Sequence, residues 1–316
     1  MRRKDYKKSK SKVRRRLLKI LLFLLLILGC LVGYIIFQYN EGRQAGESAV
    51  KSEKVKEPED FNGAVVNELG KVNILLLGVD AREDDEPART DTIMVAQYDP
   101  QANTAKLVSF MRDTYVEIPG YRNYKINTAY FLGGAELLRS TLKQNFDIDI
   151  HYYALVDFKG FEAAVDALAP DGVEIDVQKR MSEKIGVVIE PGLQQLNGKE
   201  LLGYARFRAD SEGDFGRVAR QQEVLNAIKE EVLSVTGITK LPRVVGTVQP
   251  YIETNLGNTE VLGLMSDILL KKPDDIETLR IPVDESFYDA SYSHAGSVLE
   301  IDFEQNQLAI QEFLGN

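Results

Sequence analysis

An uncharged apolar run near the N-terminus constrains this chain more than any other feature of its sequence. Residues Ile20 to Phe37 carry no charged side chain over 18 positions, which a helix stretches over roughly 27 Å, close to the hydrocarbon thickness of a bilayer. Residues 1–19 hold eleven Lys or Arg against one Asp, and a basic flank favours the cytoplasmic side. We therefore expect a transmembrane signal-anchor helix at 20–37, with a basic cytoplasmic tail at 1–19 and the remainder outside the cell.

Two other interpretations of the apolar run are less favoured. A cleaved signal peptide would have a shorter apolar run and a small-x-small cleavage site, and no such site follows Phe37. Lipidation at Cys30 would need a better cleavage motif than Leu28 allows. Because Cys30 is the only cysteine, the exported part has no disulfide and no thiol nucleophile.

The charge of the chain is divided unevenly. The first 19 residues carry +10, so −19 remains for the rest of a chain whose total is −9. A Lys- and Arg-rich tail could bind nucleic acid, but one that abuts a membrane helix is explained by topology alone. The acidic exported part also repels nucleic acid, and we expect no nucleic-acid partner.

Composition and periodicity divide the exported part into two regions. Residues 38–71 are polar and mixed in charge, which is typical of a solvated linker. From residue 72, strand-like and helix-like segments alternate. The expected strands are Val72 to Val79, buried on both faces, then Ile93 to Tyr98, Lys106 to Phe110, Tyr153 to Val156, Gly172 to Val177 and Thr278 to Pro282. The expected helices are Gly133 to Phe146, Phe158 to Leu168, Gly198 to about Ala205, Val218 to Leu233 and Val261 to Leu270.

This alternation predicts an α/β fold for one domain at 72–316. We expect three layers, α-β-α, with a central mixed sheet, preceded by the single N-terminal transmembrane helix.

The residue inventory removes several chemistries. There are two histidines, His151 and His294, and neither has a metal-ligand spacing to its neighbours, which disfavours zinc and His-dependent nucleophilic catalysis. The chain contains no GxxxxGK[ST] motif and no GxGxxG after a strand, which disfavours the familiar nucleotide sites. What remains is a pattern of acids and arginines.

Two aspartates stand at strand ends, Asp80 after the first strand and Asp91 just before the second. Adjacent strands could bring them together, and two carboxylates are a suitable seat for Mg²⁺, which completes its shell with water and phosphate oxygens. The acid-rich loop between them leaves open that both simply face water.

Basic residues recur near the expected ends of strands and helices. Their guanidinium groups suit the oxygens of a diphosphate. Arg206 and Arg208 share a face only if the helix from Gly198 ends near Ala205, while Arg217 and Gln221 are four apart on one helical face. Surface salt bridges remain the alternative for any single one of them.

Seven further segments stand in order along the chain: VNILLLGVDAR, RTDTIMVAQYDP, LVSFMRDTYVEIPG, KINTAYFLGG, DIDIHYYALVDFKGFEAAVDAL, LNGKELLGYARFRAD and GDFGRVARQQEVL. Together they resemble the LytR-CpsA-Psr family, and the GDFGR stretch is similar to the wall teichoic acid transferases of that family. This resemblance implies transfer of an anionic glycopolymer, such as a teichoic acid or capsular polysaccharide, from an undecaprenyl-pyrophosphate carrier to peptidoglycan. It implies Mg²⁺ as cofactor and a catalytic domain on the outer face of the cell membrane.

The resemblance also implies residue roles. The metal-associated acids fall on Asp80 and Asp91. The pyrophosphate-binding groups fall on Arg89, Arg112, Lys125, Arg206, Arg208, Arg217 and Gln221, and the expected catalytic set is Arg89, Asp91, Arg112, Arg206 and Arg208.

Three positions depart from the family pattern, and two other activities stay open. Met111 replaces a usual proline, Leu202 a usual alanine and Asp171 a usual glycine; the first could alter how Arg112 is presented, since proline fixes φ. The same residues would serve a polyprenyl-diphosphate hydrolase. A membrane-bound regulator or glycolipid-binding module without turnover is the other alternative.

Overall fold

The computed structural model describes residues 29–30, 32–48, 60–66, 70–79, 90–210, 213–271 and 275–315. Within these ranges no helix is both long enough and apolar enough to cross a membrane. Residues 20–28 and 31 of the apolar run lie outside the description, so the transmembrane helix stays a prediction.

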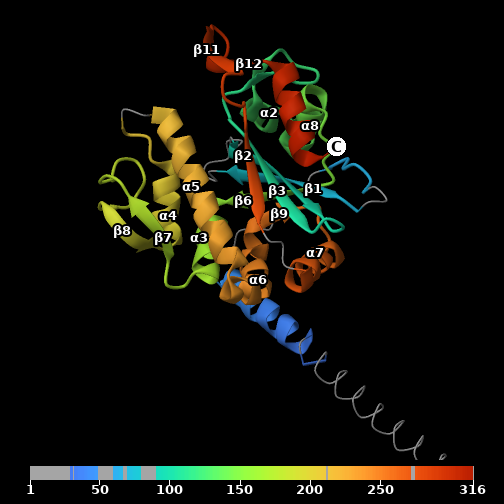
Figure 1. Ribbon diagram of the computed structural model, residues 1–316, viewed down its shortest axis with the longest axis vertical. Helices are drawn as coiled ribbons and strands as arrows, with labels where there is room; N and C mark the ends of the chain where they lie inside the picture. The colour runs from blue at the N-terminus through green and yellow to red at the C-terminus, as the bar shows by residue number, and fades with distance from the viewer. Residues whose placement is uncertain are drawn as a thin grey trace, which may run out of the picture.

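A six-stranded mixed sheet forms the centre of the domain (Figure 1). Its strands, in spatial order, are β10 (Ile276–Ile281), β3 (Thr104–Phe110), β2 (Thr90–Asp99), β1 (Val72–Val79), β6 (Tyr152–Asp157) and β9 (Ile252–Thr254). β1 pairs antiparallel with β2 and parallel with β6, and β10 pairs parallel with β3. The predicted mixed sheet is confirmed, and its longest strands lie where the sequence placed them.

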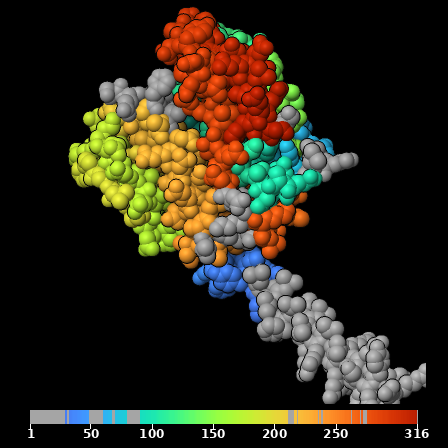
Figure 2. Space-filling model, viewed as in Figure 1, coloured from blue at the N-terminus to red at the C-terminus, as the bar shows by residue number. Residues whose placement is uncertain are grey.

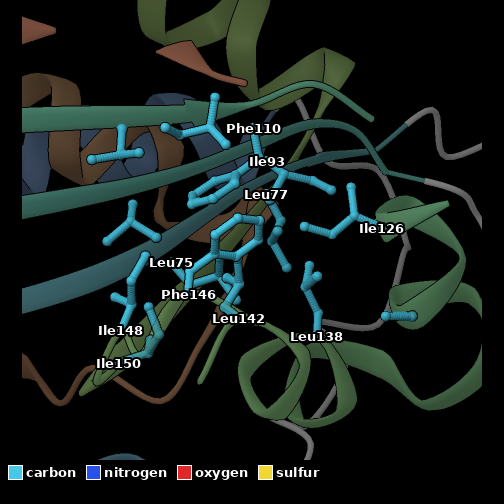
Figure 3. Close-up of a cluster of buried hydrophobic side chains, with 14 of the residues drawn as sticks. Leu75, Leu77, Ile93, Phe110, Ile126, Leu138, Leu142, Phe146, Ile148 and Ile150 are labelled. Carbon is cyan, nitrogen blue, oxygen red and sulfur yellow. The ribbon is translucent and has the colours of Figure 1, made fainter. Parts of the chain in front are cut away.

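One face of the sheet packs against α2 (Ile126–Phe146) and α8 (Phe303–Leu314). Figure 3 shows Leu75, Leu77 and Ile93 from the sheet pointing toward Leu142 and Phe146 of α2. Burial of such side chains stabilises by roughly 1.5–3 kcal/mol each. This layer is the main hydrophobic core.

Helices on the opposite face form the third layer. They are α3 (Phe158–Leu168), α4 (Gly198–Arg206), α5 (Gly213–Leu233), α6 (Val235–Val248) and α7 (Asn258–Lys271), with the 3-10 turn η1 (Gln249–Tyr251) after α6. A second core joins α3, α4 and α5 to the hairpin of β7 (Val173–Val177) and β8 (Gly192–Leu196). The three layers agree with the expected α/β class.

The prediction that the first strand is buried on both faces is wrong. Burial along β1 alternates strictly: Leu75, Leu77 and Val79 are buried, whereas Leu76 and Gly78 are only half-buried. The half-buried face lines a cavity instead of a packed core. The side chains of β1 are apolar on both faces of the sheet because one face packs in the core and the other lines the cavity.

Two short hairpins were not expected from the sequence. β4 (Tyr115–Val116) pairs with β5 (Tyr124–Lys125), and β11 (Phe287–Tyr292) pairs with β12 (Gly296–Ile301). A parallel bridge between Thr114 and Leu299 joins them. The helix predicted from Gly133 proves to be the second part of α2, which has non-helical geometry at Gly133 and at Gly134, where φ is +61°.

The expected solvated linker contains segments that pack on the domain, and to that extent the expectation is wrong. Residues 32–48 are helical and lie beneath α6 (blue in Figures 1 and 2). The contact is close because it is made by glycines: a Cβ on Gly42 would stand 2.1 Å from the Arg243 carbonyl oxygen, and one on Gly246 would stand 2.2 Å from that of Tyr39. Phe61 also packs on Tyr153, with ring centroids 4.9 Å apart.

Candidate functional site

A cavity of about 560 Å³ lies between the half-buried face of the sheet and the third layer. Its walls come from β1, β2 and β6 on one side and from α3, α4, α5 and α6 on the other. It is large enough for a substantial part of an extended lipid or a drug-sized ligand.

The interior of the cavity is apolar over most of its lining. Leu76 and Met94 from the sheet face Phe161 of α3 and Leu225 of α5. Val248, at the end of α6, and Ile252 also line it. Both follow Gly246, where residues 32–48 contact α6, by at most six positions in the chain. The cavity therefore extends to the side of the domain that carries the N-terminal segment.

The polar lining of the cavity gathers five of the residues expected at a site. They are Asp91, Arg206, Arg208, Arg217 and Gln221. Asp91 and Arg217 also line a second, smaller hollow together with Arg112, Gln221 and Arg280. The two hollows meet at Asp91, Arg217 and Gln221, and we call these three residues, together with Arg112, Arg206 and Arg208, the mouth of the cavity.

The end of α4 explains how Arg206 and Arg208 reach the same cavity. The helix begins with a capping box between Asn197 and Glu200 and ends at Arg206, one residue beyond the predicted end. Phe207 is extended, with φ −62° and ψ 132°, and its side chain is buried. Because side chains alternate in extended backbone, the arginines on either side of Phe207 leave the chain in one direction, as the spacing predicted.

A buried ion pair holds this loop on α5. Arg220 donates from Nη1 to Asp210 Oδ2 at 3.0 Å and from Nη2 to the carbonyl oxygen of Phe207 at 2.7 Å. The two charged side chains are 6% and 8% exposed, and Lys179 adds an ion pair to the same Asp210 oxygen at 2.9 Å. This clamp fixes Arg208, in the loop, relative to Arg217, one turn before Arg220.

A second contact joins α4 to α5. The hydroxyl of Tyr204 donates to Glu223 Oε2 at 2.5 Å. Burial and this hydrogen bond raise the pKa of Tyr204 well above its usual value, so the phenol stays a neutral donor. Burial likewise raises the pKa of Glu162 on α3.

A chain of contacts leads outward from the mouth. Arg112 donates from Nη1 to Asp91 Oδ1 at 2.6 Å, and its Nε lies 3.6 Å from Asp113 Oδ2. Lys125 donates to Asp113 Oδ1 at 2.8 Å. Lys125 thus does not line the cavity but is connected to it through Asp113 and Arg112.

Only part of the expected metal site lies within the described residues. Asp80 and Arg89 lie outside the described residues, and among those described no group of three His, Cys, Asp or Glu side chains is arranged to hold a metal. Asp91 suits a Mg²⁺ ligand because its carboxylate is 39% exposed and lines the cavity, although its Oδ1 also accepts a hydrogen bond from Arg112. The residues present therefore fit a cation that keeps most of its shell from water and substrate oxygens.

The structure adds Arg280, which sequence reasoning missed. It lies in β10, opposite Ser109 of β3, and its side chain lines the smaller hollow with Arg112 and Arg217. Its ion-pair partner is Asp284, which is 90% exposed. A lone arginine in a strand gives no signal in the sequence, and only the pairing of β10 with β3 places it here.

Comparisons with known proteins agree with this architecture. The model of the LytR_cpsA_psr family matches residues 33–310. Regulatory protein MsrR of Staphylococcus aureus (strain COL) is 45% identical over 284 residues, which cover 90% of this chain and 85% of MsrR. The polyisoprenyl-teichoic acid--peptidoglycan teichoic acid transferase TagU of Bacillus cereus (strain AH820) is 33% identical over 267 residues, 82% of this chain and 87% of TagU.

Solved structures resemble the chain as well. The crystal structure of TagV from B. subtilis has a TM-score of 0.65 at 29% identity and covers 79% of this chain and 99% of TagV. The structure of TagT bound to LI-WTA has a TM-score of 0.60 at 26% identity and covers 84% of this chain and 95% of TagT.

Proposed function

The chain belongs to the LytR_cpsA_psr family, and from this premise we propose that it transfers an anionic glycopolymer from a polyisoprenyl-pyrophosphate carrier to peptidoglycan. The observation that carries the proposal is the pairing of an apolar cavity with a mouth of arginines. A lipid diphosphate is complementary to this pair, because its hydrocarbon chain suits the apolar cavity and its charged diphosphate suits the arginines. TagU bears the name of a teichoic acid transferase that acts on this class of donor, and TagT has been solved with a wall teichoic acid compound.

The prenyl chain enters the cavity and the diphosphate stays at its mouth. There Arg206, Arg208 and Arg217 bind the phosphate oxygens, and Gln221 adds an amide donor. Arg112 holds Asp91 in place at the edge of the same site. Arg89 and Asp80 complete the set in this proposal. The carrier we propose is undecaprenyl pyrophosphate.

Transfer requires one bond to form and one to break. The oxygen of a peptidoglycan sugar hydroxyl attacks the phosphorus that bears the glycopolymer, and the bond from that phosphorus to the bridging oxygen of the diphosphate breaks. Undecaprenyl phosphate leaves with the electron pair, and the hydroxyl proton passes to a carboxylate other than the two that hold the metal. The arginines stabilise the charge that develops on the leaving phosphate. Phosphoryl transfer is catalysed mostly by such electrostatic stabilisation and by positioning of the reactants.

We also propose Mg²⁺ as cofactor, held by Asp80 and Asp91. When bound, the ion neutralises diphosphate charge and polarises the phosphoryl group. Replacing Asp91 with Asn and finding undiminished Mg²⁺-dependent transfer would contradict this assignment.

The proposal also places the domain on the outer face of a cell membrane. The apolar run at 20–37 overlaps the helical residues 32–48, whose later part packs on α6 near the apolar end of the cavity. A lipid leaving the bilayer beside this segment reaches the cavity from its apolar side. In this proposal residues 1–19 stay in the cytoplasm and the domain faces the cell wall.

Two alternatives use the same site. A hydrolase would place water where the sugar hydroxyl attacks, and a regulator would bind the glycolipid without turnover; the name of MsrR, a regulatory protein, favours considering the latter. The test incubates the full-length chain with Mg²⁺, a polyprenyl-diphosphate-linked saccharide and a peptidoglycan oligomer, followed by mass spectrometry of all products. Saccharide phosphate on the oligomer supports the transferase. Free saccharide phosphate with unmodified oligomer supports the hydrolase, and bound but unchanged donor supports the regulator.

A further inference from the structure

A cluster of aromatic rings lies on the surface beside the mouth. Tyr115 of β4 stacks on Tyr292 of β11, with ring centroids 4.8 Å apart and planes inclined by 18°. His294 lies against both, at 6.3 and 5.7 Å, and meets Tyr124 of β5 edge-on at 5.5 Å. We call these four residues, together with the neighbouring Tyr288, the aromatic surface.

The aromatic surface is partly accessible. Tyr292 is 37% exposed, Tyr115, Tyr124 and His294 are half-buried, and Tyr288, four residues before Tyr292 on β11, is 65% exposed. Exposed apolar area that is concentrated in one place marks a binding surface more often than scattered side chains do. All but one of these rings are tyrosines, which combine an apolar face with a hydroxyl group and so suit a ligand that is itself amphipathic.

Hydrogen bonds hold the aromatic surface in one geometry. The Tyr115 hydroxyl lies 3.2 Å from His294 Nε2, and Tyr124 donates to the carbonyl oxygen of His294. Tyr292 donates to Glu300 of β12, and this bond raises the pKa of Tyr292 to about 12, so its hydroxyl stays protonated. A surface ordered before binding loses little conformational entropy when a ligand arrives.

The aromatic surface is continuous with the mouth. Leu299 of β12 donates its backbone N–H to the carbonyl oxygen of Asp113 at 2.9 Å. The carboxylate of Asp113 binds Lys125, which pairs with Tyr115 in the β4–β5 hairpin. From Asp113 the contacts run through Arg112 to Asp91, which lines the cavity.

Its position agrees with the side from which an acceptor must come. In an in-line displacement the attacking oxygen stands opposite the leaving group. The leaving prenyl phosphate has its chain in the cavity, which extends toward α6 and residues 32–48. The β11–β12 hairpin lies at the other end of the molecule (red in Figures 1 and 2).

We propose that the aromatic surface binds the acceptor glycan, a β-1,4-linked chain of N-acetylated amino sugars. This inference rests on the proposed function and specifies its acceptor subsite. One face of such a sugar presents C–H groups, which pack on the negative face of an aromatic ring. Its amide N–H and hydroxyl groups donate to the phenol oxygens, since the O–H groups of Tyr124 and Tyr292 are already used within the aromatic surface. An anionic donor polymer matches this surface less well, because Glu300 stands among the rings.

The histidines provide a direct test. The chain has two, His294 in the aromatic surface and His151, which is buried beside Asn73 near the start of β1. We would label histidine rings with ¹³C and ¹⁵N in the full-length chain and titrate it with hexa-N-acetylchitohexaose. The proposal predicts that the His294 ring resonances shift with saturation while those of His151 do not move. Shifts of both or of neither would overturn it.

Variants identify the surface independently of turnover. Tyr292→Ala and Tyr288→Ala are each expected to weaken hexasaccharide binding about tenfold, the ratio that corresponds to about 1.4 kcal/mol. Tyr292→Phe keeps the ring but loses the hydrogen bond to Glu300, and it should weaken binding less than Tyr292→Ala does. Leu193→Ala, which removes a side chain 68% exposed on β8, is the matched control and should change nothing. Parental binding by both alanine variants would overturn the proposal.

The transfer assay separates this inference from the proposed function. If both hold, Tyr292→Ala raises the KM for the glycan acceptor and leaves the KM for the lipid donor unchanged. Hexasaccharide binding that the tyrosine variants abolish, in a chain that transfers nothing, sustains the subsite and refutes the transferase. Normal transfer by Tyr292→Ala and Tyr288→Ala with an unaltered acceptor KM sustains the transferase and refutes the subsite.

Discussion

The clamp between Arg220 and Asp210 makes a quantitative prediction about stability. Asp210→Ala removes the carboxylate that pairs with Arg220 at 3.0 Å, and both side chains are more than nine-tenths buried. A buried charge that loses its partner typically costs about 3–5 kcal/mol of unfolding free energy. The ion pair from Lys179 to the same Asp210 adds little, because the lysine side chain is 41% exposed.

The cost should be visible as a fall in melting temperature of about 6–20 °C, since 1 kcal/mol shifts a domain of this size by roughly 2–4 °C. The double variant Asp210→Ala/Arg220→Met removes both charges, and a neutral replacement of a buried pair is often close to isoenergetic. It should therefore be more stable than Asp210→Ala alone. Urea unfolding of the parent chain, of Asp210→Ala, of Arg220→Met and of the double variant gives the coupling energy between the two side chains.

The control is an ion pair of similar geometry at the surface. Arg180 and Glu190 approach to 3.1 Å, but their side chains are 58% and 64% exposed. Arg180→Met should change the unfolding free energy by less than about 0.5 kcal/mol. A coupling energy between Asp210 and Arg220 below about 0.5 kcal/mol would show that the clamp does not act as a buried pair.

Three further perturbations test other parts of the account. Burial lowers the pKa of His151 below its usual value, so the free energy of unfolding should be unaffected by this group above about pH 6.5 and should fall below that pH, by at most about 1.36 kcal/mol per pH unit. Urea unfolding at pH 7.5, 6.5 and 5.5 should show this slope, and an equal slope in His151→Gln would contradict the assignment. Gly246→Ala should release residues 38–48 from α6, because its Cβ would stand 2.2 Å from the Tyr39 carbonyl oxygen; hydrogen exchange in 38–48 should accelerate, whereas Gly263→Ala on α7, where nothing lies within 4 Å, should leave it unchanged. Arg280→Met should lower transfer about tenfold or more, as expected for a charge-assisted hydrogen bond worth about 1.5–3 kcal/mol; transfer at the parental rate would remove Arg280 from the site.

Segments with a strong period were predictable from the sequence. Val72 to Val79 is found as β1 with the predicted bounds, and α3 spans Phe158–Leu168 as expected. The helix α6 was missed because Gly237, Pro242 and Gly246 interrupt its pattern, although Gly246 is there for close packing against residues 32–48. The helix propensity of a segment does not include contacts with residues far away in the sequence, so it could not predict α6.

The candidate site was predictable only in part for a similar reason. The arginines of α4 and α5 could be placed because the spacing of Arg206 and Arg208 and that of Arg217 and Gln221 is local. Arg280 and the aromatic surface depend on contacts between residues more than 150 positions apart, as in the stacking of Tyr115 on Tyr292. No spacing in the chain encodes such contacts, and the sheet order and hairpin register supply them.

The chemical form of the lipid released by the full-length chain tests the central claim most directly. A polyprenyl-diphosphate-linked saccharide and a peptidoglycan oligomer are supplied with Mg²⁺, and the lipid product is identified by mass spectrometry with and without the oligomer. Attack on phosphorus breaks the diphosphate, so the account predicts prenyl monophosphate, released at a rate that depends on the oligomer, together with one phosphate retained on each modified glycan. Release of prenyl diphosphate, with saccharide joined to the glycan and no phosphate between them, would show glycosyl transfer and contradict the account.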